Sequence, residues 1–311
     1  MSVGPNTLQR LAAAWPRRAT IRTDLDNVMR PEQYDPDLPD YPASLLPFAE
    51  HPDYLEAPDE TKRLVLTLAW LSWNERVIAA EEFVANPTFE MLAHGVFPGV
   101  ETPEARETIQ QSHIDEVWHT YMHMIAMRRT REARELDSEP TYPHAITNRV
   151  LYAMESEASE RWERDLLYLL WTAVGEISIT TFLDLVAGDT TVQPRHALIA
   201  RLHSRDEAAH GPVLFEVMQG VYAKLNRKQQ ELFVRALPKG IVAFGSEDWE
   251  LWPLILESAG MAKAKEIVAD CRTLPGNALL VTDFTPVRRL VQELEIAEEV
   301  EFDFVTNQMT A

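Results

Sequence analysis

The stretch LLYLLWTAVGEISITTFLDLV, residues 166–186, decides the fold because it sets one carboxylate in the middle of an apolar helix. As far as Leu183, Glu176 is the only side chain in this stretch that carries a charge at pH 7. On a helix, Glu176 shares a face with Ala173 and Ile179, so its carboxylate points into apolar surroundings. The apolar run is a little short for a membrane span and contains Trp, Gly, Ser and Thr. We therefore expect a helix that is buried within the protein.

Composition narrows the class of protein. The chain has 311 residues, of which 46% are hydrophobic, enough for one large domain with a substantial core. Its 29 basic and 49 acidic residues give a net charge of −20, which argues against nucleic acid or an anionic membrane as a partner. A single cysteine, Cys271, excludes an internal disulfide and suits a reducing compartment. The N-terminus has no apolar run of secretory length, so we expect a cytoplasmic protein.

The chain divides at about residue 58. Residues 1–58 are rich in Pro and Asp and show little periodicity, which predicts an irregular N-terminal arm. Residues 59–311 show helical periodicity and no convincing series of strands, which predicts a single all-α domain, a helical bundle with extra C-terminal helices. The expected helices cover about 59–86, ended by the NPT sequence, then 103–134, 145–187, a helix from 194, and 226–244, 247–258, 261–272 and 285–297.

Two Glu-x-x-His motifs lie on separate predicted helices. They are EVWH, with Glu116 and His119, and EAAH, with Glu207 and His210. Residues three positions apart on a helix lie about 60° apart, so both side chains of each motif share a face. His203 stands one turn before Glu207, and the three side chains of HSRDEAAH then form a narrow stripe beside apolar neighbours. One such motif is weak evidence for a site, but two of them with an added histidine indicate a common cluster.

Two further helices each offer a single glutamate. Glu176 is the clearest, since it points into the core whichever way its helix is rotated. On the first helix Glu81 and Glu82 compete. Glu81 has apolar neighbours such as Val77 on its face, whereas Glu82 shares a side with Glu75. We therefore predict that Glu81 faces the core.

The energetics of burial decide what these carboxylates are for. A buried ionised carboxylate costs several kcal/mol, and four of them would exceed the ~5–15 kcal/mol that keeps a typical protein folded. They must be protonated, paired with Arg or Lys as in a purely structural protein, or bound to metal. Two divalent cations would neutralise four carboxylates, and a bundle with Glu, Glu-x-x-His, Glu and Glu-x-x-His on four helices is the ligand set of dimetal carboxylate proteins. The predicted metal ligands are Glu81, Glu116, His119, Glu176, His203, Glu207 and His210.

At these residues the chain resembles the ferritin-like, ribonucleotide-reductase-like diiron proteins, and in particular the AurF-type p-aminobenzoate N-oxygenase family. The discriminating feature is His203, which completes H-x-x-x-E-x-x-H, and the resemblance covers roughly residues 60–215. It implies a ferritin-like bundle with two iron ions and O₂ as co-substrate, which oxidises an amine through hydroxylamine toward a nitro or nitroso product in specialised metabolism. It also implies that Glu81, Glu116 and His119 bind one iron and the other four ligands bind the second, with Glu116 and Glu207 bridging.

The resemblance further implies an arylamine as substrate and a homodimer. Because the sequence has no flavin, nicotinamide or Fe–S motif, electrons would come from a ferredoxin or a small reductase. Manganese suits the same ligands as iron. The alternatives are a diiron hydroxylase or desaturase that acts on C–H bonds and a ferroxidase or iron-binding protein. A radical-generating reductase subunit is disfavoured because His123 stands where a tyrosine is usual.

A few further residues are candidates for supporting roles. Asp115 and Asp206 precede the two motif glutamates, and carboxylates often orient ligand histidines. His123 follows His119 by one turn and is a candidate to contact the ligands. Arg76, or the pair Arg288 and Arg289, is a candidate to hold a substrate carboxylate.

Overall fold

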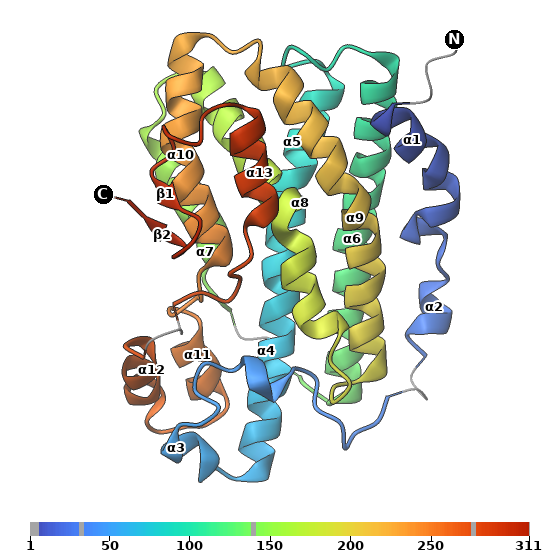
Figure 1. Ribbon diagram of the computed structural model, residues 1–311. Helices are drawn as coiled ribbons and strands as arrows, with labels where there is room; N and C mark the ends of the chain where they lie inside the picture. Colours follow the sequence, from blue (N-terminus) through green and yellow to red (C-terminus); the bar gives the residue numbers. More distant parts are fainter. Residues whose placement is uncertain (1–5, 31–33, 138–140, 275–277, 311) are drawn as a thin grey trace.

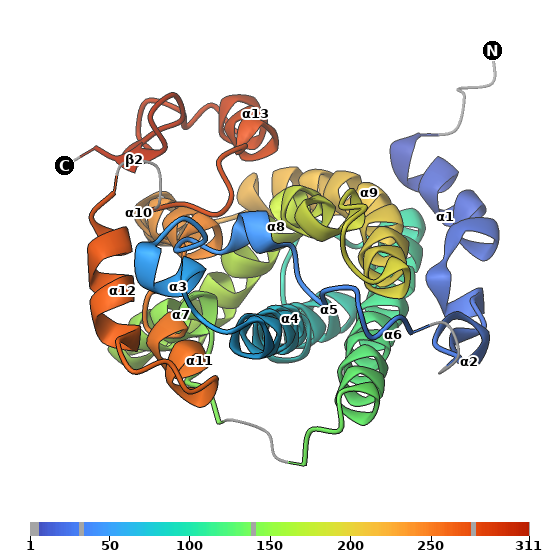
Figure 2. The same ribbon diagram turned by 90° about the horizontal axis from the view of Figure 1, so that it is seen from below.

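Four long helices form the centre of the molecule (Figure 1). The computed structural model describes residues 6–30, 34–137, 141–274 and 278–310. The four helices are α4 (Asp59–Ala80), α6 (Pro103–Ala133), α8 (Arg161–Ala187) and α9 (Pro194–Tyr222). Seen end-on, they surround a common interior, with α8 beside α9 and α6 beside both α4 and α9 (Figure 2). The all-α prediction is confirmed, and the bundle places the predicted ligand helices around one core.

The remaining elements surround this bundle. After α4 come the π-helical turn η4 (Glu81–Ala85) and α5 (Asn86–Ala93), and α7 (Ile146–Glu157) precedes α8. The C-terminal helices are α10 (Arg227–Gly245), α11 (Trp252–Ser258), α12 (Ala264–Arg272) and α13 (Thr285–Glu293). They follow the predicted segments closely, except that α11 begins at Trp252 rather than near residue 247. In the described residues the strands are limited to a short antiparallel hairpin, β1 (Phe302–Asp303) with β2 (Gln308–Met309).

Helix α8 is the core of the bundle. Its composition and length would suit a membrane span, but 78% of its most apolar window is buried inside the protein. Leu169 and Leu183 are fully buried, and the helix packs on both α9 and α10. Its apolar sequence is therefore explained by contact with other helices.

The first long helix does not end at the NPT sequence, so that prediction is wrong. The chain passes from α4 through η4 directly into α5, with Pro87 inside the first turn of α5. The N–H of Asn86 donates to the carbonyl of Glu81, five residues earlier, which is the π-helical spacing. Pro87 has no N–H and so tolerates a position where the α-helical bonding has shifted. The π-turn lets the helical path continue past the proline.

The predicted segment 145–187 is two helices rather than one. Helix α7 ends at Glu157 and α8 begins at Arg161. The side chain of Glu163 turns back to accept hydrogen bonds from the backbone N–H groups of Ser159 and Glu160, at 2.7 and 2.9 Å. The bond from Glu160 is one half of a capping box, whose other half joins the Glu160 side chain to the N–H of Glu163, and this box starts a new helix.

The N-terminal arm contains more regular structure than we expected. It holds the 12-residue helix α1 (Thr7–Arg18), whose first turn is closed by a capping box of Asn6 and Gln9. Short turns follow: η1 (Thr20–Arg22), α2 (Leu25–Val28), η3 (Ala43–Leu45) and α3 (Pro52–Leu55). Helix α1 lies beside α6 and α9, on the outside of the bundle (Figures 1 and 2). The arm thus covers the two helices that carry the Glu-x-x-His motifs.

Candidate metal centre

Four segments of the bundle deliver the predicted ligands to one interior cluster. Glu81 comes from η4, Glu116 and His119 from α6, and Glu176 from α8. Helix α9 contributes the last three, His203, Glu207 and His210. All seven side chains are buried, with relative exposures between 0% and 4%. The neighbouring Glu82, by contrast, is exposed, so the structure agrees with the choice of Glu81.

The donor atoms fall into two overlapping groups, each within 4.8 Å. One group is Glu81, Glu116, His119, His203 and Glu207, and the other is Glu116, Glu176, Glu207 and His210. Glu116 and Glu207 belong to both groups, as bridging ligands would. Because the two groups share these carboxylates, the arrangement fits a site for two metal ions.

The structure places His203 on a different side from the one implied by the family resemblance. Its Nε2 lies 3.1 Å from Glu81 Oε1, in the group of His119 rather than that of His210. His203 and His210 lie on opposite sides of Glu207 along α9, one turn before and one turn after it. The two histidines are therefore about two turns apart along the helix axis and face different ends of the cluster.

In the part of the chain that the structure describes, no Lys or Arg pairs with the four glutamates of the cluster. Every ion pair that the described residues show for these four glutamates is with a histidine. Several buried atoms of the cluster also have no hydrogen-bond partner: both carboxylate oxygens of Glu81, one oxygen each of Glu116, Glu176 and Glu207, and Nε2 of His203. Buried polar atoms normally have a hydrogen-bond partner. Carboxylate oxygens and an imidazole nitrogen that converge without one fit metal ions as the missing partner.

Protons occupy part of the cluster when metal is absent. Burial, together with neighbouring carboxylates, raises the pKa of Glu116 and Glu176 well above the usual range. Burial also opposes charge on Glu207 and His210, but their mutual attraction outweighs it. The pKa of Glu207 is therefore held well below the usual value and that of His210 well above it. Metal binding must displace protons from Glu116, Glu176 and His210.

The histidines of the two motifs are held crosswise by aspartates of the opposite helix. Nε2 of His119 on α6 lies 3.3 Å from Asp206 on α9, and Nε2 of His210 on α9 lies 3.2 Å from Asp115 on α6. A carboxylate only accepts, so each Nε2 carries the proton. The Nδ1 atoms then face the cluster, 3.4 and 2.6 Å from Glu116 oxygens, and offer lone pairs to a metal once the cluster protons are displaced. Both aspartates thus set the ring orientation that metal binding requires.

The third histidine is held differently, by neutral groups. Asn74 donates from Nδ2 to the carbonyl of Trp70 at 2.7 Å, which turns its Oδ1 toward His123 Nδ1, also at 2.7 Å. His123 therefore donates from Nδ1, and its Nε2 accepts from His203 Nδ1 at 2.9 Å. Burial and the neighbouring histidines lower the pKa of His123 well below its usual value, which keeps this ring neutral. His203 Nε2 is left without a proton and faces Glu81. The role of His123 was a candidate from the sequence, whereas nothing in the sequence pointed to Asn74.

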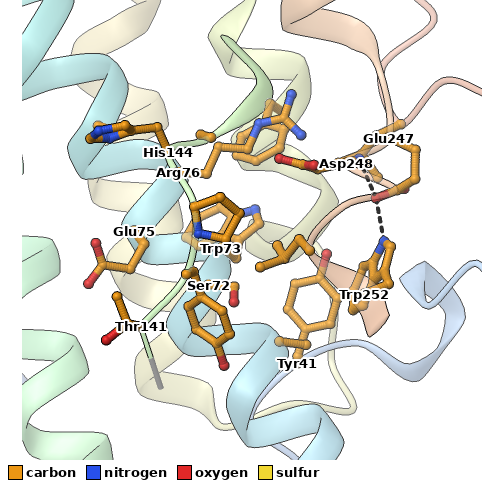
Figure 3. A pocket seen from close by; sticks show the side chains of 18 of the residues that line it. Tyr41, Ser72, Trp73, Glu75, Arg76, Thr141, His144, Glu247, Asp248 and Trp252 are labelled. Atoms are coloured by element: carbon orange, nitrogen blue, oxygen red, sulfur yellow. Dashed lines mark hydrogen bonds between the residues drawn. The ribbon is translucent and has the colours of Figure 1, made fainter. Parts of the chain in front are cut away.

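A cavity of about 380 Å³ lies between α4, α8 and the start of α7 and α11 (Figure 3). Trp73 and Phe182 line it and stack on each other, with ring centroids 5.5 Å apart. The Trp73 ring also lies 5.7 Å from that of His123. Arg76 also lines the cavity, where its guanidinium donates to the carbonyls of Phe244 and Ser246.

The other arginines that the sequence suggested for a substrate carboxylate do not line this cavity. Arg288 and Arg289 lie exposed on α13, and Arg289 covers the ring of Phe215.

A helical bundle that brings four buried glutamates and three histidines into two overlapping ligand groups defines a ferritin-like dimetal carboxylate protein. Residues 3–295 match a family model described as "P-aminobenzoate N-oxygenase AurF". The chain is also similar to the 4-aminobenzoate N-oxygenase of Streptomyces thioluteus, with 44% identity over 302 residues, which are 97% of this chain and 90% of that protein. The chain belongs to the p-aminobenzoate N-oxygenase AurF family, and the family resemblance read from the ligand motifs is confirmed.

Proposed function

We propose that this protein is a diiron N-oxygenase that uses O₂ to oxidise an arylamine, through the hydroxylamine, toward a nitroso or nitro product. The observation that carries the proposal is the buried cluster of four glutamates and three histidines, in a chain of this family. The ligands we assign are Glu81, Glu116, His119, Glu176, His203, Glu207 and His210. When bound, two iron ions would activate O₂, which is the source of the oxygen atom that is transferred to the amine nitrogen.

The residues of this chain prepare the site for that chemistry. The bridging positions of Glu116 and Glu207 would hold the two ions at a fixed separation. The rings of His119 and His210 present Nδ1, and that of His203 presents Nε2, because their other nitrogens are engaged. Burial excludes bulk water, so reactive species would meet the substrate rather than solvent.

We infer that the arylamine reaches the centre through the cavity beside α4 and α8 (Figure 3). The rings of Trp73 and Phe182 give the cavity an apolar aromatic wall, and the guanidinium of Arg76 adds a positive charge beside it. Helices α4 and α8 also lead to Glu81 and Glu176, so the cavity and the cluster share walls. Trp73 lines the cavity and also contacts His123, so we infer that the amine passes this ring to react.

A variant that narrows the cavity tests this route of the arylamine. Ala79 lines the cavity from α4, and Ala79→Phe would fill part of it. We expect the KM for an arylamine to rise about tenfold, in line with the loss of a few ring contacts, while the iron content is unchanged. An unchanged KM in the folded variant would exclude the cavity as the route.

We propose that the electrons come from a ferredoxin or a small reductase in the cytoplasm and that the enzyme is a homodimer. A single cysteine that is buried suits a reducing compartment. Three large apolar side chains at helical spacing on α6, those of Val117, Tyr121 and Met124, are about half exposed and offer a surface for a second copy. The molar mass in solution, measured by light scattering, tests the dimer.

The central experiment is turnover of the iron-loaded protein with 4-aminobenzoate, O₂ and a chemical reductant. Mass spectrometry should detect the hydroxylamine and then more oxidised products, with ¹⁸O incorporated from ¹⁸O₂. Oxidation of another arylamine instead of 4-aminobenzoate would keep the reaction class and change the substrate. If only hydrocarbons are hydroxylated, or if iron is stored without turnover of any amine, the proposal fails.

A further inference from the structure

The end of helix α1 and the turn that follows it reach both aspartates that hold the ligand histidines. Helix α1 and η1 pack against α6 and α9, at the outer side of the bundle (Figures 1 and 2). From this position Trp15, Arg18 and Thr20 contact Asp115 and Asp206. None of these three arm residues was predicted from the sequence.

Each aspartate has its own partner in the arm. The indole Nε1 of Trp15 donates to both oxygens of Asp115, at 3.0 and 2.9 Å. The backbone N–H of Thr20 donates to Asp206 Oδ2 at 2.9 Å, and its hydroxyl donates to the same oxygen. Asp115 and Asp206 are both 0% exposed, so these bonds replace water that a carboxylate would otherwise bind.

Arg18 joins the two halves. Its Nη1 donates to Asp206 Oδ1 at 3.2 Å and to the carbonyl of Asp206 at 3.1 Å, while its Nη2 lies 3.9 Å from Asp115 Oδ2. A buried anion whose partner is lost is strongly unfavourable. One guanidinium therefore stabilises two buried carboxylates that would otherwise add to the negative charge of the cluster.

We propose that Trp15, Arg18 and Thr20 are positioning residues, which orient His210 and His119 through Asp115 and Asp206 and so set the metal affinity of both halves of the centre. This inference rests on the proposed metal centre. It assigns to the N-terminal arm, which carries no ligand, the control of one ring in each ligand group. Trp15 acts on the His210 half, Thr20 acts on the His119 half, and Arg18 acts on both.

The test is a set of variants measured for metal binding rather than for activity. The purified, metal-free proteins are titrated with Co²⁺, and crystals of the Co²⁺-loaded proteins give the occupancy of each position from anomalous scattering. Removal of groups that orient ligand histidines lowers metal affinity by about 10–100-fold. We expect Trp15→Phe to weaken the His210 position, Thr20→Val the His119 position, and Arg18→Met both. Arg17→Met, a change in the exposed neighbouring residue, is the matched control and should leave both affinities as in the wild type.

Two comparisons separate positioning from a merely structural role. Trp15→Phe and Thr20→Val each remove one hydrogen-bond donor and report on folded protein even if Arg18→Met does not fold. Arg18→Lys keeps the positive charge but loses the planar guanidinium that reaches both aspartates. Compared with Arg18→Met, it should recover metal affinity at one position only. If the wild type binds no metal, the metal centre itself fails. If the wild type binds two ions and all three arm variants bind them equally well, the centre stands and the positioning role is overturned.

Discussion

The histidines of the cluster fall into two kinds, which differ in the group that binds the ring nitrogen facing away from the cluster. His119 and His210 are backed by the buried carboxylates Asp206 and Asp115, whereas His203 is backed by the neutral ring of His123. A carboxylate makes the imidazole a more basic ligand, while a neutral acceptor only fixes its tautomer. Four glutamates would already neutralise two divalent ions, so the two aspartates add further negative charge. Arg18 lies against both aspartates and offsets part of that charge, and the His203 side has no further anion to balance.

The largest expected effect is the loss of a carboxylate that both halves share. Glu207→Gln removes the negative charge of a carboxylate that belongs to both ligand groups. Loss of a partner in a buried charged cluster costs about 3–5 kcal/mol, so we expect N-oxygenation to fall by about 10²–10⁴-fold and the iron content to fall below two per chain. Iron analysis and product yield measure this. Glu216→Gln, at an exposed position of the same helix, is the control and should behave as the wild type.

The histidine-backed side is tested at His123. His123→Leu removes the acceptor for His203 Nδ1, so the proton of His203 is free to move to Nε2 and block the lone pair. We expect the affinity of the His203 position to fall by about 10–100-fold, as measured by Co²⁺ titration. His123→Gln offers both an acceptor and a donor and should recover part of the affinity. Equal affinities in all three proteins would mean that His203 needs no such partner.

The carboxylate-backed side should be less sensitive to a conservative change. Asp206→Asn keeps an oxygen that accepts from His119 but removes its charge. We expect a loss of about tenfold in affinity at that position, the lower end of the range for groups behind metal ligands. A loss larger than that of His123→Leu would reverse the comparison and show that the charge matters more than the tautomer.

Metal binding should strengthen as the pH rises. The raised pKa values of Glu116, Glu176 and His210 mean that the metal-free cluster holds protons above the usual pH for these groups. A rise in pH removes protons that the metal must displace, by up to about tenfold in affinity per pH unit for each proton. Calorimetry in buffers of different ionisation enthalpy, between about pH 6 and 8, counts the protons released. Affinity that is constant or falls over this range would contradict the assignment of these groups as ligands.

The smallest effect belongs to the neighbour of a ligand. Glu82→Gln changes an exposed carboxylate next to Glu81, and we expect unchanged iron content and turnover because Glu82 points away from the cluster. Glu81→Gln is the informative partner and should lose iron. If the two variants exchanged these effects, the π-turn would place the wrong glutamate in the site.

The sequence predicted which Glu and His side chains gather in the core better than it predicted their surroundings. Glu176 stood out because a lone carboxylate in an apolar helix needs a partner, and the Glu-x-x-His spacing follows from helical geometry alone. These are properties of single helices, so they can be read without the tertiary structure. The helix boundaries of α6 and α9 were predictable for the same reason, since proline at the first turn marks their start.

The errors lie where two segments meet. The continuation of the first helix past Pro87 depends on a π-turn, which local propensity does not indicate. The group to which His203 belongs depends on where η4 approaches α9. Asp115 pairs with His210, which is 95 positions away in the sequence, and with Trp15, which is 100 positions away. No periodicity in one sequence encodes such pairs.

The most direct test of the account is a crystal structure of the iron-loaded protein with anomalous data collected at the iron edge. The account predicts two iron positions bridged by Glu116 and Glu207, with His119 and His203 on the iron of Glu81, and His210 on the iron of Glu176. A single iron, or none, or a cluster in which a guanidinium or a proton neutralises Glu176, would contradict it.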